Sequence, residues 1–254
     1  MAKLKAAVLL LAAAATAHAD WAILSTNLEP GGAGVVHRRA VMENATAGGR
    51  AVVDLAIFAA KSCTLRMIQN QDGTNNLAEA MTREKCLAGV NGGYFDPNFA
   101  PIGLRIVDGQ MIAPLQRARL ITGALTASAR GVQIVRVREY SRKQRVSAAI
   151  QCGPFLVDLE KHVRGLDDSH LARRTFAATG TNDRALLGVC SKISLSELAK
   201  VLATLQFAED LKIERALNLD GGSSSAFWFA RKNGSAFSIP EQKTVRDFVA
   251  IVPK

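Results

Sequence analysis

The sequence has no internal repeat, no low-complexity tract beyond its N-terminus, and no later hydrophobic run long enough to span a bilayer. Glycine and proline together supply only 27 of the 254 residues, which excludes a collagenous or Pro/Gly-rich disordered chain. No spacing of Cys and His is typical of a zinc site. The composition, 48% hydrophobic and 21% charged, is that of a globular protein with enough apolar residues for a packed core.

The N-terminus has the pattern of a secretory signal peptide covering residues 1–19. Lys3 and Lys5 form a basic start, residues 6–15 are an unbroken apolar run, and Ala17-His18-Ala19 places small residues at the expected cleavage site. A transmembrane helix, the alternative, needs about 18 or more apolar residues, and this run is shorter. We therefore expect a periplasmic or secreted protein with no stable membrane insertion, in which residues 20–254 form one domain.

A positive excess remains after the signal peptide is removed. Cleavage takes away two lysines and no acidic residue, which lowers the formal charge from +10 to +8. A basic protein attracts anionic partners over long range. We expect a sugar phosphate or an anionic glycan rather than nucleic acid, because the Lys and Arg residues are scattered and no base-stacking motif accompanies them.

The four cysteines are predicted to form disulfides, because an even number in an oxidising compartment favours pairing. Closeness in the sequence favours Cys63 with Cys86, and Cys152 with Cys190. The alternative is that all four are buried free thiols.

Short apolar runs bounded by turn residues recur along the chain and predict strands. An Asp-Gly pair at 108–109 lies between two such runs and predicts a hairpin. Helices are expected at 76–86, from a partial apolar face, and after Ser194, which forms a capping box with Glu197. This pattern favours an α+β domain with a largely antiparallel or mixed sheet and a few flanking helices. The predicted strands are 35–41, 50–59, 64–68, 88–91, 102–107, 110–113, 120–126, 132–137, 146–150, 155–158, 186–190, 216–219 and 245–252.

Two segments share a pattern in which an apolar strand is followed by a polar residue and then by glycines. One contains Asn91-Gly92-Gly93, and the other contains Asn218-Leu219-Asp220-Gly221-Gly222. Glycines after a strand allow backbone N–H groups to converge on an anionic oxygen, while the polar side chains lie on a rigid support beside them. The alternative is two tight turns in which Asn and Asp hydrogen-bond the backbone.

Six segments occur in a distinctive order and spacing. They are 91–96, 101–104 leading to Asp108-Gly109, 151–157, Arg174-Thr175, 194–198 and 218–224. Together they resemble the phosphodiester glycosidase family, from about residue 88 to the C-terminus. The sequence departs from the usual pattern of that family at Ala178, at Ser223 and at Cys190-Ser191-Lys192.

The resemblance implies hydrolysis of a sugar that is linked through its anomeric carbon to a phosphodiester. Such a cleavage develops positive charge on the sugar and negative charge on the departing phosphate. Asp220 is the expected catalytic carboxylate, Arg174 pairs with the phosphate through its forked donors, and Asn91 orients substrate oxygens. The other expected substrate-binding residues are Gly92, Gly93, Thr175, Asn218, Gly221, Gly222 and Ser223. No cofactor is implied. A turn-capping Asp220 and a surface cation at Arg174 are the alternatives.

Three other functions fit parts of the sequence. The serines at 223–225 follow a glycine like the nucleophile of a serine hydrolase, although the closing glycine of that motif is missing. The bases available to such a nucleophile in residues 20–254 are His37, His162 and His170. A divalent cation has possible ligands in Asp96, Asp183 and Asp220. A secreted module that binds anionic glycan without cleaving it is the main alternative to an enzyme.

Overall fold

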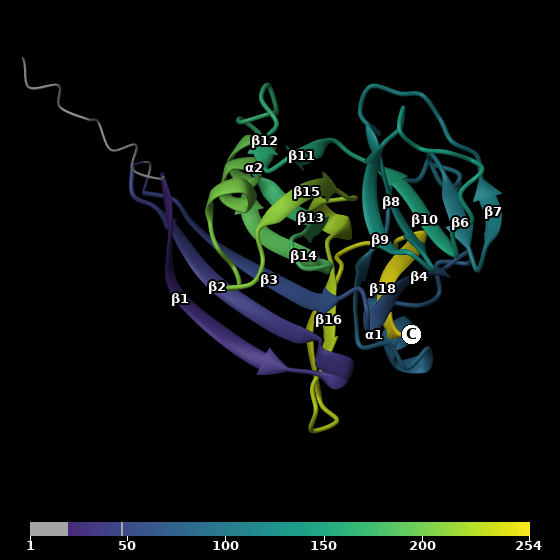
Figure 1. Ribbon diagram of the computed structural model, residues 1–254, viewed down its shortest axis with the longest axis horizontal. Coiled ribbons are helices and arrows are strands. Elements are labelled where there is room, and N and C mark those ends of the chain that lie inside the picture. The colour runs from purple at the N-terminus through teal and green to yellow at the C-terminus, as the bar shows by residue number, and fades with distance from the viewer. Residues whose placement is uncertain (1–19, 47) are drawn as a thin grey trace, which may run out of the picture.

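The computed structural model describes residues 20–46 and 48–254, so the predicted signal peptide lies outside the described residues. The described chain forms three antiparallel sheets with two α-helices (Figure 1). The eight-stranded sheet has the order β1 (Trp21–Pro30), β2 (Val36–Asn44), β3 (Arg50–Ala59), β14 (Arg184–Ile193), β13 (Ala172–Gly180), β15 (Ile213–Asn218), β11 (Phe155–Asp158) and β12 (Lys161–His162). One five-stranded sheet has the order β7 (Gln110–Ala113), β6 (Arg105–Val107), β10 (Ala148–Cys152), β8 (Gly123–Ser128) and β9 (Gly131–Arg136). The other has the order β17 (Ala236–Ile239), β16 (Phe227–Ala230), β5 (Ala88–Asn91), β18 (Asp247–Pro253) and β4 (Cys63–Gln69).

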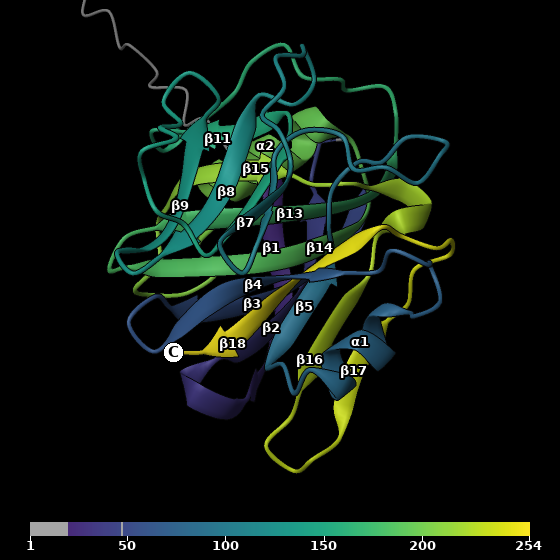
Figure 2. The same ribbon diagram turned by 90° about the vertical axis from the view of Figure 1, so that its right-hand side faces the viewer.

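The three sheets pack around one shared core, to which each contributes buried side chains such as Leu187, Ile150 and Val249. Helix α2 (Leu195–Thr204) covers the opposite face of the eight-stranded sheet with Leu198 and Leu202. Helix α1 (Leu77–Arg83) covers the outer face of the sheet that contains β5, beside β16 (Figure 2). The central strands of both sheets are therefore buried on both faces.

Burial on both faces explains the sequence of the central strands. In β14, Leu187 and Val189 enter the shared core, whereas Leu186 and Cys190 face the α2 layer. Apolar residues consequently occur in a continuous run rather than alternating with polar residues. Strand β15 follows the same rule and ends at Asn218, which places the polar segment 218–220 at the edge of the core.

The predicted antiparallel sheet core with a few flanking helices is confirmed, but the fold is mostly β rather than of the predicted α+β class. The predicted hairpin at Asp108-Gly109 and both helices are confirmed, and the strand pairings are antiparallel throughout the described sheets. The sequence did not predict β1, β12, β13, β16 or β17. Strand β13 begins Ala-Arg-Arg-Thr and has weak strand propensity, and its hydrogen bonds to β14 and β15 on either side hold it extended. Neither helix of the described chain is long and apolar enough to cross a membrane.

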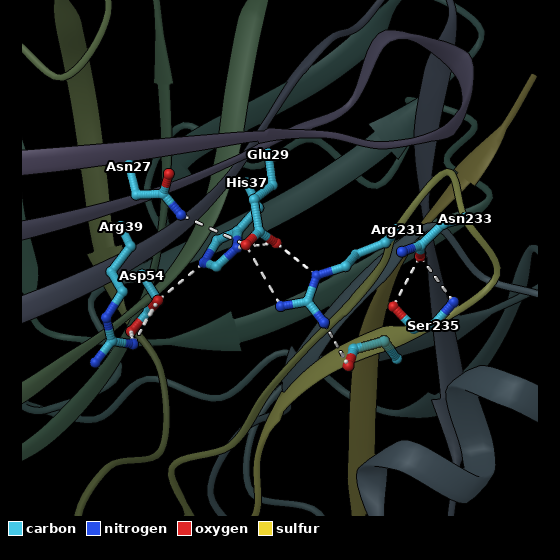
Figure 3. A network of polar contacts seen from close by, with 9 residues as sticks. Asn27, Glu29, His37, Arg39, Asp54, Arg231, Asn233 and Ser235 are labelled. Atoms are coloured by element: carbon cyan, nitrogen blue, oxygen red, sulfur yellow. Dashed lines mark hydrogen bonds and ion pairs between the residues drawn. The ribbon is translucent and has the colours of Figure 1, made fainter.

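His37 is part of a junction between two sheets rather than a catalytic base (Figure 3). Its ring on β2 is fully buried and stacks on Phe237 of β17, with 4.7 Å between the ring centroids. Its Nε2 lies 2.8 Å from Oδ1 of Asp54 on β3. Nearby, Nε of Arg231 donates to Oε2 of Glu29 at 2.7 Å, so the loop after β16 is tied to β1. These contacts fix the β16–β17 hairpin against the eight-stranded sheet.

The predicted disulfides are wrong, because all four cysteines are free and buried. Cys63 lies in the shared core and Cys86 lies under α1, while Cys152 lies in the shared core and Cys190 lies under α2. The members of each predicted pair are thus in different layers of the molecule. Closeness in the sequence does not bring them together, since Cys86 lies between α1 and β5 on the opposite face of the sheet from Cys63, and Cys152 and Cys190 belong to different sheets.

We expect all four thiols to be titratable only after unfolding. Burial raises the pKa of Cys86 to about 11 and the pKa values of Cys152 and Cys190 to about 12, which suppresses the reactive thiolate in the folded protein. An aromatic disulfide reagent added to protein purified without reductant should detect four thiols in denaturant and few at pH 8 without it. Detection of two thiols or none in the denatured protein would contradict this prediction.

Candidate active site

The two predicted glycine-rich segments meet at the buried side chain of Asn91. Asn91 lies at the end of β5 and has no exposed surface. Its Oδ1 accepts hydrogen bonds from the Thr175 hydroxyl at 2.7 Å and from the Ala226 N–H at 3.0 Å. Its Nδ2 donates to the Asp220 carbonyl at 2.7 Å. One amide therefore joins β5, β13 and the turn after β15, which are distant in the sequence.

A buried ion pair supports the first glycine-rich segment. Nε of Arg105 lies 2.8 Å from Oδ2 of Asp247, and both side chains are almost fully buried. The remaining donors of Arg105 bond backbone carbonyls, including those of Tyr94 and Gln151. The ion pair thus holds the start of β18, the strand β10 and the segment after β5 in one arrangement.

Gly92 and Gly93 are required by this ion pair. A Cβ at Gly92 would lie 1.8 Å from Oδ1 of Asp247, and a Cβ at Gly93 would lie 2.1 Å from Nη2 of Arg105. The Gly92 N–H donates to the Asp247 carbonyl and the Gly93 N–H donates to the Asp247 carboxylate. These two N–H groups are already used, so the predicted phosphate contact with them is not available in this geometry.

Tyr94 links the two segments on the other side of Asn91. Its hydroxyl donates to the Gly153 carbonyl at 2.7 Å and accepts from Nδ2 of Asn218 at 3.0 Å. Burial raises the pKa of Tyr94 well above its usual range, the charge of Asp220 raises it further, and the guanidinium of Arg174 opposes this shift. The phenol is therefore neutral, and it lies within electrostatic reach of both predicted catalytic groups.

Asp220 is a half-buried carboxylate at the end of β15. Burial raises its pKa above the ordinary value, while the neighbouring Ser224 hydroxyl, the Lys243 ammonium and the Gly221 N–H act in the opposite direction. Its backbone N–H donates to the Gly92 carbonyl at 3.2 Å. A carboxylate whose pKa is raised by burial beside cationic groups is typical of a functional site, and a simple turn-capping Asp does not need these surroundings.

Arg174 is buried and is not a surface cation. Its Nε donates to the Ile193 carbonyl at 3.1 Å and its Nη2 donates to the His170 carbonyl at 2.5 Å. Burial lowers the pKa of Arg174, with Asp167 acting against that change. The adjacent Thr175 is fully buried and its hydroxyl is bound to Asn91, so Thr175 supports the site from beneath and does not face a ligand.

Buried polar atoms without a hydrogen-bond partner gather around Asp220. The described residues contain eight such side-chain atoms. Five of them belong to residues around the turn that carries Asp220, a region called the Asp220 corner from here on. These five are Nη2 of Arg173, Oδ1 of Asn218, Oγ of Ser224, Oγ of Ser225 and Oε2 of Glu241. Because buried polar groups are normally paired, their concentration at one corner makes it the candidate place for a polar ligand or an ordered water.

A cavity of about 560 Å³ lies on the other side of the segment that carries Arg174. Trp21, Leu171 and Ile193 line it, and the carbonyl of Ile193 is also the acceptor for Nε of Arg174. Leu171 and Ile193 thus line this cavity close to the two carbonyls, of His170 and Ile193, that Arg174 binds.

A family model described as phosphodiester glycosidase matches residues 84–252. The chain belongs to that family. The match includes β5, Tyr94, Arg105, Arg174, Asp220 and Asp247, which are the elements and residues that build the corner described above. No match was found among curated proteins.

Solved structures share the fold of this family member at low sequence identity. The zebrafish N-acetylglucosamine-1-phosphodiester alpha-N-acetylglucosaminidase catalytic domain, auto-inhibited by its pro-peptide, is 14% identical, with a TM-score of 0.61 over 94% of this chain and 85% of that chain. A hypothetical protein from Synechocystis is 15% identical, with a TM-score of 0.59 over 87% of this chain and 62% of that chain. A candidate exported protein from Burkholderia pseudomallei is 14% identical, with a TM-score of 0.56 over 81% of this chain and 75% of that chain.

The structure does not support two of the alternatives predicted from the sequence, the serine nucleophile and the divalent-cation site. The hydroxyls of Ser224 and Ser225 have no hydrogen-bond partner, so neither is paired with a histidine base, and Ser223 is exposed. No group of three or more His, Cys, Asp or Glu side chains in the described chain is placed to hold a metal ion. Asp96 caps its own turn, and Asp183 lies at the other end of the eight-stranded sheet, 3.8 Å from Lys61.

Several residues at or beneath the corner were not predicted as site residues from the sequence, among them Tyr94, Arg105, Arg173, Glu241 and Asp247. Tyr94 directly follows the predicted Gly92-Gly93 pair, so the pattern there contained a signal for it. Arg105 and Asp247 lie within apolar strands, and nothing local indicates that they pair across 142 positions.

We expect Asp247→Ala to lower the free energy of unfolding by about 3–5 kcal/mol, because it leaves the Arg105 guanidinium buried without its partner. Urea unfolding of the two proteins measures the difference. Asp72→Ala at an exposed position is the matched control, and we expect it to change the free energy by at most about 0.5 kcal/mol. An equally small effect of Asp247→Ala would show that the ion pair does not hold the site together.

Proposed function

We propose that this chain is an exported hydrolase that cleaves the bond between the anomeric carbon of a sugar and a phosphodiester. The observation that carries the proposal is the position of Asp220, a half-buried carboxylate of raised pKa at the corner where unpartnered polar atoms gather. Membership of the phosphodiester glycosidase family supports the reaction class. The name of the zebrafish relative supports an N-acetylhexosamine 1-phosphodiester as the first substrate to test.

In this proposal the Asp220 carboxylate faces the anomeric carbon. Cleavage develops positive charge there, and a fixed negative charge in a partly desolvated site stabilises it. A phosphodiester is already a good leaving group, so it needs less help from a general acid than the alcohol of an ordinary glycoside does. The bond from the anomeric carbon to the phosphate oxygen then breaks, the phosphate leaves as an anion held by cationic groups, and a water adds to the anomeric carbon and gives its proton to the Asp220 carboxylate.

The proposed binding roles differ among the residues of the corner. The turn formed by Gly221, Gly222 and the exposed Ser223 offers backbone groups and a hydroxyl to the sugar, and Gly222 has the positive φ of 64° that this turn requires. Asn218 offers its unpartnered Oδ1. Asn91 is a positioning residue, since its side chain holds the Asp220 backbone and has no exposed surface.

Two further features of the proposal are export and an anionic substrate. The N-terminal pattern of residues 1–19 and the description of the Burkholderia neighbour support an exported protein. The positive charge of the chain favours an anionic substrate and does not require nucleic acid.

We expect Asp220→Asn to lower kcat by roughly 10²–10⁴-fold on a sugar 1-phosphodiester, because the amide cannot supply negative charge or accept a proton. Release of free sugar from the methyl diesters of glucose, galactose and N-acetylglucosamine 1-phosphates measures the effect. Asp210→Asn, in an exposed ion pair with Arg184, is the control and should retain full activity. Equal activity of wild type and Asp220→Asn would remove Asp220 from the mechanism, and binding without hydrolysis by either would favour a glycan-binding module.

We expect kcat/KM to fall on the acidic side of its pH profile, with the midpoint of this acidic limb above about pH 4, the usual pKa of Asp. The reason is that burial raises the pKa of Asp220 while catalysis needs the ionised form, so activity is lost as the pH falls through that raised value. Lys243→Gln removes a charge that lowers this pKa, and we expect it to move the limb to higher pH. Lys61→Gln, at a position that is 83% exposed, is the control and should leave the limb unchanged. A limb at or below pH 4 would contradict the assignment.

A further inference from the structure

One guanidinium nitrogen of Arg173 has no hydrogen-bond acceptor in the described chain. Its Nε donates to the Gly222 carbonyl at 3.3 Å and its Nη1 donates to the Pro240 carbonyl at 3.2 Å. Its Nη2 is buried and has no hydrogen-bond partner. The guanidinium therefore lies between the turn after Asp220 and the loop that begins at Pro240, with one donor unused.

The two adjacent arginines of β13 have different surroundings. Arg174 donates to the carbonyls of His170 and Ile193, which hold the chain before β13 against the end of β14. Arg173 instead contacts the turn that follows the proposed catalytic carboxylate, and the Arg173 carbonyl lies 3.0 Å from the position of a Cβ on Gly221. Both arginines therefore lie against the Asp220-Gly221-Gly222 turn, since Cα and Cδ of Arg174 are each 3.9 Å from the same Cβ position, but the guanidinium that bonds the turn is that of Arg173.

The charge of Arg173 is not neutralised by a closed ion pair. The carboxylate that acts on it is Glu241, yet among the described residues neither Nη2 of Arg173 nor Oε2 of Glu241 has a hydrogen-bond partner. Oε1 of Glu241 accepts the Leu77 N–H at 2.8 Å, and its Oε2 is itself without a partner. Burial lowers the pKa of Arg173, but an arginine remains charged at neutral pH. A buried cationic donor without an acceptor is unfavourable, and a phosphate oxygen would relieve it.

We propose that Arg173 is the residue that binds the phosphate of the substrate through Nη2, and that Arg174 anchors the segment before β13. This inference rests on the proposed function and reassigns the phosphate contact predicted from the sequence for Arg174. It makes Arg173 the determinant of specificity for anionic over neutral glycosides, because a neutral substrate leaves this donor unpaired.

Calorimetric binding of sugar 1-phosphates tests the assignment without requiring turnover. The probes are the 1-phosphates of glucose, galactose and N-acetylglucosamine, titrated into wild type, Arg173→Gln, Arg173→Lys and Arg174→Gln. A hydrogen bond from a charged donor corresponds to a loss of about 10- to 150-fold in affinity for Arg173→Gln. Arg173→Lys should bind with intermediate affinity, since it keeps the charge and loses the fork, and Arg174→Gln should bind within about threefold of wild type if its role is structural.

A comparison of hydrolysis of a charged and an uncharged substrate is the second test. A purely structural role of Arg173 would affect both substrates equally. Arg173→Gln should lose activity on the methyl 1-phosphodiester and retain it on the uncharged aryl glycoside of the same sugar. Equal losses on both substrates, or a lowered unfolding midpoint that accounts for the weaker binding, would show that Arg173 only clamps the two loops. Lys61→Gln, remote and exposed, controls for the loss of one positive charge and should match wild type.

The outcomes separate this inference from the proposed function. If wild type binds a sugar 1-phosphate and Arg173→Gln does not, while no diester is hydrolysed, the phosphate contact stands and the hydrolase proposal fails. If wild type hydrolyses a diester and Arg173→Gln is unchanged, or Arg174→Gln alone loses binding, the assignment of Arg173 is overturned. Absence of binding by wild type to all three probes would also overturn it.

Discussion

The side-chain amide of Asn91 is the contact on which the arrangement of the corner depends. Its two polar atoms connect three parts of the chain that lie far apart in the sequence, and no water reaches them. An amide serves here because its acceptor and its donor are separate atoms that point in different directions, whereas an ionised carboxylate cannot donate and a hydroxyl must make all its bonds through one oxygen. The same side chain therefore sets where the Asp220 backbone lies relative to the end of β5, and hence which direction the carboxylate faces.

Much of the sheet architecture could be predicted from the sequence, because apolar runs and turn residues are local signals. The hairpin at Asp108-Gly109 and the helix after Ser194 are examples, although only Ser194 completes its half of the capping box: its hydroxyl accepts from the Glu197 N–H, while the Glu197 carboxylate bonds Trp21 and Lys200. Strand β13 could not be predicted in the same way. Its extended conformation is imposed by neighbours on both sides, and such pairing leaves no trace in the sequence of the strand itself, which has two arginines near its start and alanines where other strands have Val or Ile.

The candidate site divides along the same line. Asn91 and Asp220 each precede a pair of glycines at or just after the end of a strand, so the sequence indicated both segments. The fold brings the two segments together. What each glycine does was not predictable: Gly92 and Gly93 are small because Asp247 and Arg105 approach them, not because a ligand does. A buried ion pair between distant strands is a tertiary property that the sequence does not show. In the structure, Asp247 of this ion pair accepts hydrogen bonds from the N–H groups of Gly92 and Gly93, which the local pattern had predicted for a ligand. The raised pKa of Asp220 likewise arises from burial, and no residue spacing encodes it.

The layered placement of the four thiols has a consequence for how the protein matures. The four thiols are buried and unpaired in three different clusters, with Cys63 and Cys152 both in the shared core, so the native structure contains no bond that an oxidation step would have to form. Glutathione, thioredoxin and disulfide-forming catalysts are irrelevant to that process. The polypeptide can therefore acquire the same native state in a reducing cytoplasm as in an oxidising envelope, and a host strain chosen for its production needs no special redox background.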